Sequence, residues 1–173
     1  RHATRVWRMV VEISVLMASY PSADVARLSY EYRTLGLGYA NLGTVLMRLG
    51  LPYDSEEGRA FCGAVTAILP GQSYATSAEM ASELGPFPAY DRNRESMLRV
   101  MRNHRGAAHD VHQEEYEGLS IFPTPIKTES CASDLVQAAR DCWDEDVQIG
   151  VKHGYSNAQS TVIVPPGTIV LAV

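Results

Sequence analysis

Segments of helix length, most of them ended by a proline or a glycine, occupy most of this 173-residue chain. Residues that favour the start of a helix, such as Ser22 and either Asp54 or Ser55, precede several of them. Gly50, Gly85 and Gly154 stand where a helix would end. These helix-starting and helix-ending residues predict a mainly helical fold. The expected helices span about residues 4–19, 23–32, 40–49, 55–69, 77–84, 91–109 and 133–153.

Four features carry more specific expectations. Apolar residues on nearly every face of residues 4–19 predict that this helix is buried. Pro70-Gly71 predicts a break or a kink between two helices. Thr76-Ser77 before Glu79 resembles a helix-capping arrangement. The stretch His112–Ala132 has no clear period, and loops of this length are often functional or wrap a neighbour.

Two short segments have the composition of strands. Leu35–Gly38 holds two glycines beside a leucine, which fits a short buried strand or a tight turn better than a helix interior. Thr161–Val164 is β-branched and is followed by prolines, as is typical of a buried strand. The sequence therefore predicts about two strands in an otherwise helical chain.

The second of these strands leads into Pro165-Pro166-Gly167-Thr168-Ile169. A strand that enters a glycine-containing turn followed by a hydroxyl residue presents backbone N–H groups outward, and such groups can hold a phosphate. A simple strand-ending turn has the same pattern. Both interpretations stay open on the pattern alone.

Composition argues against several classes of protein. The net charge of −5 disfavours nucleic acid as a partner. No stretch reaches the roughly 18 uninterrupted apolar residues that a membrane span needs, and no signal peptide is evident. Cys62, Cys131 and Cys142 are odd in number and form no CxxC pair. They indicate a reduced, cytoplasmic protein in which the cysteines are buried small residues.

The other polar groupings favour structural roles. His104, His109 and His112 do not share one helical face, so no metal site is expected. The consecutive acids Asp144–Asp146 spread around a helix and indicate a solvated face. Glu12 and Glu31 sit among apolar residues and, if buried, need basic partners. The expected partners are Arg5, Arg8 and Arg33.

Six strings in the chain carry a resemblance to a known family. They are Arg33–Gly43, Met47–Ser55, Tyr74–Ala81, Glu83–Pro88, Arg99–Arg105 and Lys152–Gln159. Together they resemble the C-terminal half of the large chain of adenosylcobalamin-dependent (class II) ribonucleotide reductases, over nearly the whole sequence. The resemblance implies an α/β barrel of parallel strands joined by helices. Residues 1–173 would be a single partial domain of it, helix-dominated, with about two short strands that are neighbours in the barrel.

The resemblance also implies a function, the radical reduction of ribonucleotides to deoxyribonucleotides. Adenosylcobalamin would serve the complete enzyme, and none is expected for this segment alone. The family's active cysteine, carboxylate, asparagine and redox cysteines are expected outside this chain, so no catalytic residue is assigned to it. Asp110-Val111-His112 begins like a cobalamin-binding pattern, but Glu115 stands where that pattern requires glycine. The family binds its cofactor without this pattern.

One functional element of the family maps onto this sequence, the loop that cradles the substrate's phosphate groups. In the family it reads alanine-proline-threonine-glycine-threonine-isoleucine-glycine, and here Val164, Pro166 and Val170 replace the first, third and last of these. Pro166 removes one N–H donor and one hydroxyl. A charge-assisted donor is worth about 1.5–3 kcal/mol. The resemblance thus implies a weakened or lost ribonucleotide-phosphate site at Pro165, Pro166, Gly167, Thr168 and Ile169.

The two ends of the sequence suggest a piece of a longer chain, because it begins at Arg1 and stops in an apolar run, Thr168–Val173. Taken alone, such a piece would expose the first helix and residues 170–173, which predicts a homo-oligomer. Two functions follow: a reductase segment that is inactive alone, or a non-catalytic stand-alone helical binding or assembly module. A third function, regulatory nucleotide binding, is not supported, because the sequence has no P-loop or dinucleotide-binding fingerprint.

Overall fold

The computed structural model describes residues 1–164. This part of the chain is helix-dominated, as predicted. It contains the helices α1 (His2–Leu16), α2 (Ala23–Tyr32), α3 (Leu42–Leu49), α4 (Glu56–Leu84), α5 (Tyr90–His109) and α6 (Ser133–His153) and the short 3-10 turns η1 (Gln113–Glu115) and η2 (Thr128–Ser130).

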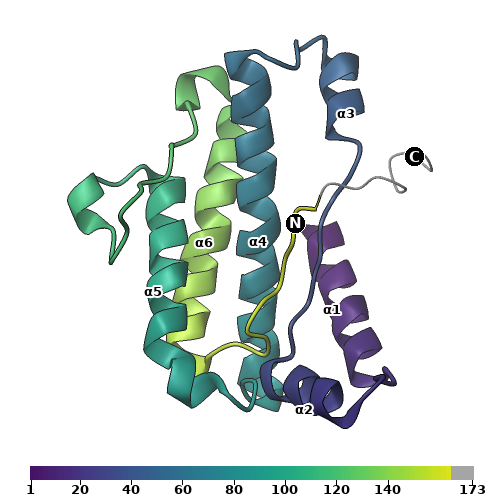
Figure 1. Cartoon of the computed structure of the whole chain (residues 1–173). Coiled ribbons are helices and arrows are strands. Elements are labelled where there is room, and N and C mark those ends of the chain that lie inside the picture. Colours follow the sequence, from purple (N-terminus) through teal and green to yellow (C-terminus); the bar gives the residue numbers. More distant parts are fainter. Residues whose placement is uncertain (165–173) are drawn as a thin grey trace.

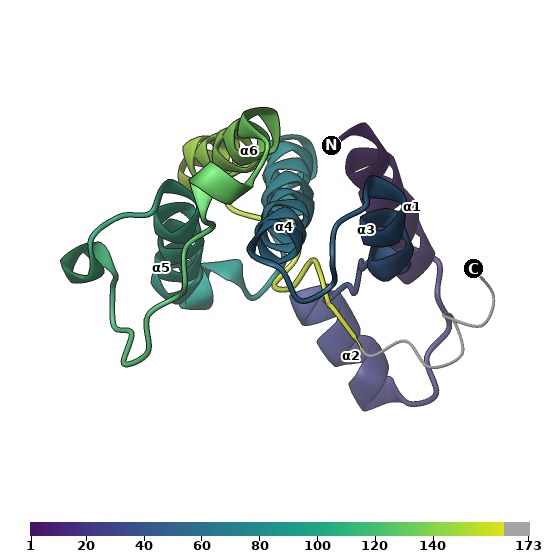
Figure 2. The same ribbon diagram turned by 90° about the horizontal axis from the view of Figure 1, so that it is seen from above.

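The three longest helices form one layer, in which α6 packs against both α4 and α5 (Figure 1). Helix α1 packs on the other side of α4, so α4 lies between α6 and α1 (Figure 2). The predicted caps help to set these helices. The hydroxyl of Ser22 accepts from the backbone N–H of Val25, and the hydroxyl of Ser55 accepts from that of Gly58.

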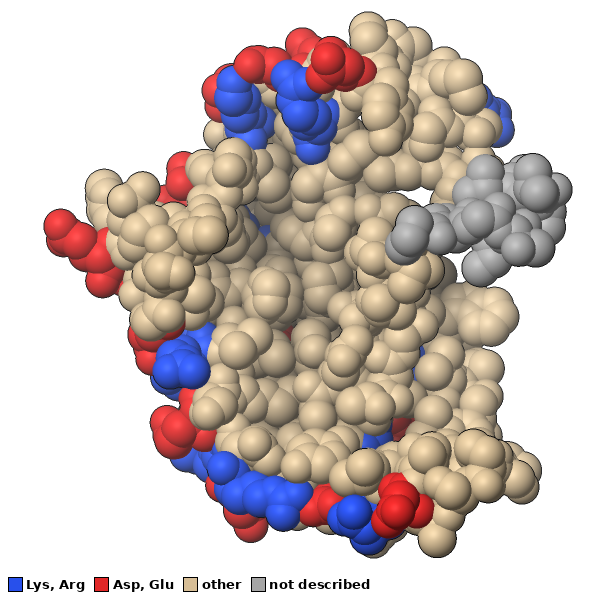
Figure 3. Space-filling view, in the orientation of Figure 1, with Lys and Arg blue, Asp and Glu red and all other residues tan. Residues whose placement is uncertain are grey.

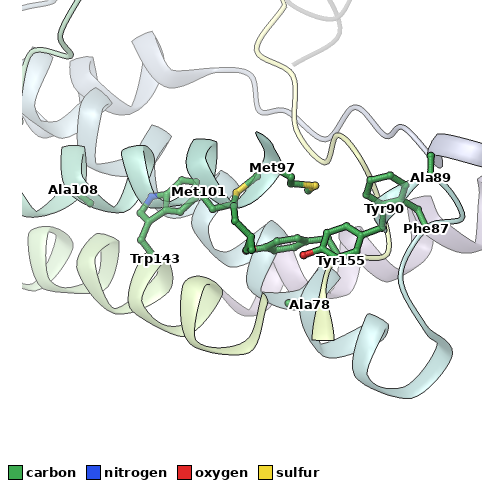
Figure 4. Close-up of a cluster of buried hydrophobic side chains, with 10 residues drawn as sticks. Ala78, Phe87, Ala89, Tyr90, Met97, Met101, Ala108, Trp143 and Tyr155 are labelled. Atoms are coloured by element: carbon green, nitrogen blue, oxygen red, sulfur yellow. The ribbon is translucent and has the colours of Figure 1, made fainter. Parts of the chain in front are cut away.

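An aromatic core fills the space between α4, α5 and α6 (Figure 4). The rings of Phe87 and Tyr90 meet edge to face at 5.5 Å, and Tyr90 and Tyr155 do so at 6.3 Å. Fully burying a large apolar side chain stabilises a fold by about 1.5–3 kcal/mol. The buried members of this core are Ala78, Phe87, Ala89, Tyr90, Met97, Leu98, Met101, Ala108, Trp143 and Tyr155.

Helix α4 corrects the prediction of a break at Pro70, because it runs without interruption from Glu56 to Leu84. A proline inside a helix removes one backbone hydrogen bond. Close packing against α6 offsets that loss. A Cβ added to Gly71 would lie 2.9 Å from the Cβ of Cys142 and 3.2 Å from the Trp143 ring. Thr76 and Ser77 are therefore in the helix interior and cap nothing.

The two predicted strands are not formed as strands in residues 1–164, but the two segments lie side by side. They meet in one parallel bridge between Leu37 and Thr161. The N–H of Val162 donates to the carbonyl of Leu37 at 3.0 Å. A Cβ added to Gly38 would lie only 2.5 Å from the Val162 carbonyl oxygen, which explains the glycine there. A ladder between two segments alone is marginally stable, and no third strand pairs with them among these residues.

Helix α1 corrects the prediction of a buried helix. Its buried residues are the charged Arg8 and Glu12, whereas Trp7, Ile13 and Leu16 are 59%, 55% and 56% exposed. These apolar side chains are exposed because the inward positions of α1 are taken by Arg8 and Glu12, which bond to Asn157, Ser160 and Arg33. Their exposure is what was expected for the chain taken alone.

Candidate functional site

The structure describes the approach to the predicted phosphate loop, and Pro165, Pro166, Gly167, Thr168, Ile169 and the run 170–173 lie outside the described residues. After α6 ends, residues 156–164 run beside residues 33–41 and in front of α4 (yellow and dark blue in Figure 1). The middle of this face has few charged side chains, and those of the face gather at its upper, left and lower margins (Figure 3). The candidate site is thus an extended segment resting on the helices behind it.

A group of buried polar side chains, here called the buried polar cluster, holds this segment from below. It consists of Arg8, Glu12, Arg33, Ser73, Ser77, Asn157 and Ser160. The Arg8 guanidinium is central to it. Its Nε donates to the Ser160 hydroxyl at 2.9 Å, its Nη1 to Glu12 at 3.2 Å, and its Nη2 to the Asn157 side-chain oxygen.

Glu12 is the one carboxylate of the buried polar cluster. It accepts from Arg8, from Arg33 and, at 2.5 Å, from the Asn157 amide. The predicted pairing of Glu12 with Arg8 and Arg33 is confirmed. The same prediction is wrong for Glu31, whose partners are Arg27 and Arg92 instead.

Two guanidinium groups share this single carboxylate, so the buried polar cluster carries an excess positive charge. Burial lowers the pKa of Arg8, and the attraction of Glu12 opposes that shift. The Nε of Arg33 is buried without a hydrogen-bond partner among residues 1–164. The positive charge therefore lies directly beneath the segment that leads to the predicted anion site.

Serine side chains connect the segment to α4. The hydroxyls of Ser73 and Ser160 lie 2.5 Å apart, and the Ser77 hydroxyl donates to the side-chain oxygen of Asn157 at 3.1 Å. The backbone N–H of Ser160 donates to the Tyr74 hydroxyl at 3.3 Å. Residues 157–160 are thus bonded to both α1 and α4.

A second buried carboxyl, Asp146 on α6, corrects the prediction of a solvated face at Asp144–Asp146. Asp146 is fully buried, and neither of its oxygens has a hydrogen-bond partner in the described part of the chain. Burial raises its pKa to about 8, an effect opposed in part by the neighbouring Tyr155 hydroxyl. The sequence did not predict the burial of Asp146. The neighbouring Asp144 and Glu145 have partly exposed side chains, and each forms an ion pair with an arginine.

The cysteines and histidines are dispersed. Burial raises the pKa of the Cys142 thiol to about 11, and it also raises the pKa values of Cys62 and Cys131. His104 stacks on Trp143 at 4.9 Å, and burial lowers its pKa. No group of three His, Cys, Asp or Glu residues that could hold a metal ion occurs among residues 1–164.

The irregular stretch His112–Ala132 folds back against α4 and α5 and borders a cavity of about 380 Å³. Its walls are mainly apolar and include Pro70, Ile126 and Trp143. Pockets for drug-sized ligands occupy about 300–1,000 Å³. A corrin with its nucleotide tail is larger than such ligands, so this cavity does not fit cobalamin. No described helix is long and apolar enough to cross a membrane.

The sequence gave one usable signal for the buried polar cluster, namely Arg8 and Glu12 at i, i+4 within an apolar helix. It did not indicate Asn157, Ser160 or Ser73. In each of the bonds Arg8–Ser160, Arg8–Asn157 and Ser73–Ser160, the two residues are 80 or more positions apart in the sequence. Small polar residues are common in helices and loops, and only the fold shows that these are fully buried.

Comparison with known proteins gives a consistent result. A family model described as ribonucleotide reductase, barrel domain, matches residues 1–173. A vitamin B12-dependent ribonucleotide reductase from Agrobacterium fabrum is 60% identical over 97% of this chain and 13% of its own length. Proteins of the same name from Bradyrhizobium diazoefficiens and Rhodopirellula baltica are 58% and 44% identical, over 97% and 98% of this chain and 13% and 15% of theirs.

Proposed function

The chain belongs to the ribonucleotide reductase barrel-domain family, and we propose that it supplies the segment of a vitamin B12-dependent reductase that holds the substrate's phosphate groups. The chain spans about 13% of the length of the relatives from Agrobacterium fabrum and Bradyrhizobium diazoefficiens. The reaction of the whole enzyme would be the radical reduction of a ribonucleotide to a deoxyribonucleotide. The segment would contribute binding and would not catalyse the reaction alone.

The observation that carries this proposal is the fixed approach to the loop. Ser160 is bonded from two sides, by Arg8 at 2.9 Å and by Ser73 at 2.5 Å, and Thr161 follows in the bridge with Leu37. A turn that leaves a fixed segment presents its backbone N–H groups in a defined direction, which favours binding of a phosphate. The excess positive charge of the buried polar cluster favours an anion at the same place.

The chemistry of the described side chains supports a binding role. Loss of hydration raises the pKa of all three thiols, of which Cys142 is buried and Cys62 and Cys131 are partly buried, whereas a reactive cysteine needs a lowered pKa. Adenosylcobalamin would supply the radical in the complete enzyme. We infer that its site lies in the parts of the longer relatives that this chain does not cover.

Calorimetric titration of the chain with ribonucleoside di- and triphosphates, and with pyrophosphate, tests the phosphate site. We expect saturable binding that disappears in the double variant Gly167→Ala, Thr168→Ala. The chain offers a matched control in Gly43→Ala, Thr44→Ala, the same residue pair on α3, where a Cβ on Gly43 meets nothing within 4 Å. A folded chain that gives no heat at millimolar ligand would refute the phosphate site.

The proline in the predicted loop allows a gain-of-function test. Pro166→Thr restores the N–H donor and the hydroxyl that the family's residue carries. We expect pyrophosphate to bind about tenfold more tightly, the equivalent of one charge-assisted hydrogen bond. An unchanged affinity would mean that residue 166 does not face the phosphate.

A second function, that of a non-catalytic binding or assembly module, is favoured by one observation. Trp7, Ile13 and Met17 lie on the exposed face of α1, and Met17 is 80% exposed. Contiguous apolar surface of this kind marks an interaction site. Association of the chain without any nucleotide affinity would support this alternative over the first function.

A further inference from the structure

We propose that Arg8 is a positioning residue, whose guanidinium fixes residues 157–164, the segment that leads to the proposed phosphate loop. The functional part of this role rests on the proposed function, whereas the fixing of the segment can be measured without any ligand. Arg8 lies on α1, about 150 residues before the segment that it holds.

The geometry of the guanidinium carries the proposal. Arg8 bonds to two residues of the segment, donating from Nε to the Ser160 hydroxyl and from Nη2 to the Asn157 side chain. Its third donor, Nη1, is bonded to Glu12 on the same helix. The guanidinium group is planar and is itself oriented by its bond to Glu12. Its hydrogen bonds to two residues of an extended segment can therefore fix both the direction and the position of that segment.

Asn157 and Ser160 each form further hydrogen bonds besides the one to Arg8, and these restrict the position of the segment. The amide of Asn157 donates to Glu12 at 2.5 Å and to the Arg33 carbonyl at 2.7 Å. Ser160 is bonded to Ser73 on α4. The segment is therefore hydrogen-bonded to α1, to α4 and to residue 33. Arg8 bonds to both Asn157 and Ser160.

The charge balance indicates more than a structural ion pair. A buried pair of opposite charges is often no more stable than apolar residues of the same volume. Here Arg8 and Arg33 face the single carboxylate of Glu12, and Arg8 and Glu12 are both fully buried. An excess buried cation is favourable where an anion binds nearby, as the proposed phosphate site requires.

The test compares two variants of the chain with a matched control. Arg8→Lys keeps the positive charge and removes the planar guanidinium group, and Ser160→Ala removes only the hydroxyl that Arg8 and Ser73 share. The control is Arg27→Lys, which alters an arginine paired with Glu31 at the same i, i+4 spacing but on the exposed surface of α2. Ser160→Ala keeps the test decisive if Arg8→Lys does not fold.

Two readouts are measured, amide hydrogen exchange of residues 157–164 without ligand and calorimetric affinity for pyrophosphate. In folded variants we expect exchange of this segment to become at least about tenfold faster, and pyrophosphate affinity to fall about tenfold, the scale of one lost hydrogen bond to a charged group. Exchange in α5 and α6 should stay unchanged, as should both readouts in Arg27→Lys. A purely structural role would instead raise exchange throughout the chain.

Exchange of residues 157–164 as slow as in the unaltered chain, in either folded variant, would overturn the positioning role of Arg8. Faster local exchange with unchanged pyrophosphate affinity would overturn its link to the phosphate loop. If the unaltered chain itself binds no pyrophosphate, the proposed function fails, and the exchange measurement still decides whether Arg8 fixes the segment.

Discussion

At the scale of single residues, Asp146 has the most unusual environment in residues 1–164. A carboxyl without a hydrogen-bond partner is strongly disfavoured as an anion inside a protein. The folded chain therefore holds it as the neutral acid up to a pKa of about 8, compared with an ordinary value of 3.8. The unfolded chain releases this proton at the lower value. Its contribution to stability is thus complete below pH 3.8 and is lost as the pH rises to about 8.

The variant Asp146→Asn tests this linkage, because its side chain cannot ionise. We expect the unaltered chain to lose about 5 kcal/mol of unfolding free energy between pH 4 and pH 8 through this group, and the variant to be spared that loss. Urea unfolding at several pH values measures it. Asp141→Asn is the control, since Asp141 is an exposed residue of the same helix. Parallel pH profiles for Asp146→Asn and the unaltered chain would contradict the expectation.

Glycine at position 38 is the second residue whose environment makes a definite prediction. A Cβ there would lie 2.5 Å from the Val162 carbonyl oxygen, too close for the bridge between Leu37 and Thr161 to persist unchanged. We expect Gly38→Ala to destabilise the chain by about 1–3 kcal/mol. In Gly43→Ala, where the Cβ meets open space on α3, we expect a gain of about 0.5–1 kcal/mol. Denaturant midpoints of the two variants should therefore shift in opposite directions.

At the scale of elements, Pro70 tests how packing competes with local preference. The helix α4 continues through it, although a proline leaves the carbonyl four residues earlier, that of Thr66, without its usual donor. Alanine restores that donor, so we expect Pro70→Ala to raise the unfolding free energy by about 1–3 kcal/mol. Thermal unfolding measures the change. A loss of stability would show that the proline ring contributes more through its contacts than it removes from the helix.

The same competition explains which elements could be predicted from the sequence. Helix ends that depend on local chemistry were predictable, as at Ser22, Gly50 and Gly154. The continuity of α4 was not, because the close approach of Gly71 to α6 joins residues about 70 positions apart. Strand formation at Leu35–Gly38 and Thr161–Val164 was not confirmed, since a strand depends on neighbours that its own residues do not specify.

The candidate site shows the same division. Family resemblance indicated the loop itself, and the i, i+4 pair of Arg8 and Glu12 indicated a buried ion pair. The tethers of that pair to Asn157 and Ser160 join the first helix to the end of the described chain. Contacts so distant in sequence leave no local pattern, so the arrangement of the buried polar cluster became visible only in the folded structure.

At the scale of the whole molecule, the helices divide into a well-packed part and an open part. The aromatic core joins α4, α5 and α6 (Figure 4). The buried residues of α1 are instead the charged Arg8 and Glu12, and many of its large apolar residues are exposed. A surface with several large side chains more than half exposed favours burial against another protein surface. The curated relatives are much longer than this chain, so in them more protein is available to cover α1.

For the chain alone, this exposed face predicts self-association in solution. It includes the large side chains of Trp7 and Ile13, which are about 1.7 turns apart on α1 and 59% and 55% exposed. We expect the double variant Trp7→Gln, Ile13→Gln to weaken association by at least about tenfold, the loss expected when large apolar anchors leave an interface. Ile121→Gln is the control, because Ile121 is 85% exposed but lies between η1 and η2, on the opposite side of the molecule from α1 (Figure 1). Sedimentation equilibrium measures both variants. A chain that stays monomeric at high concentration, or an Ile121→Gln effect equal to that of the α1 variant, would contradict an interface at α1.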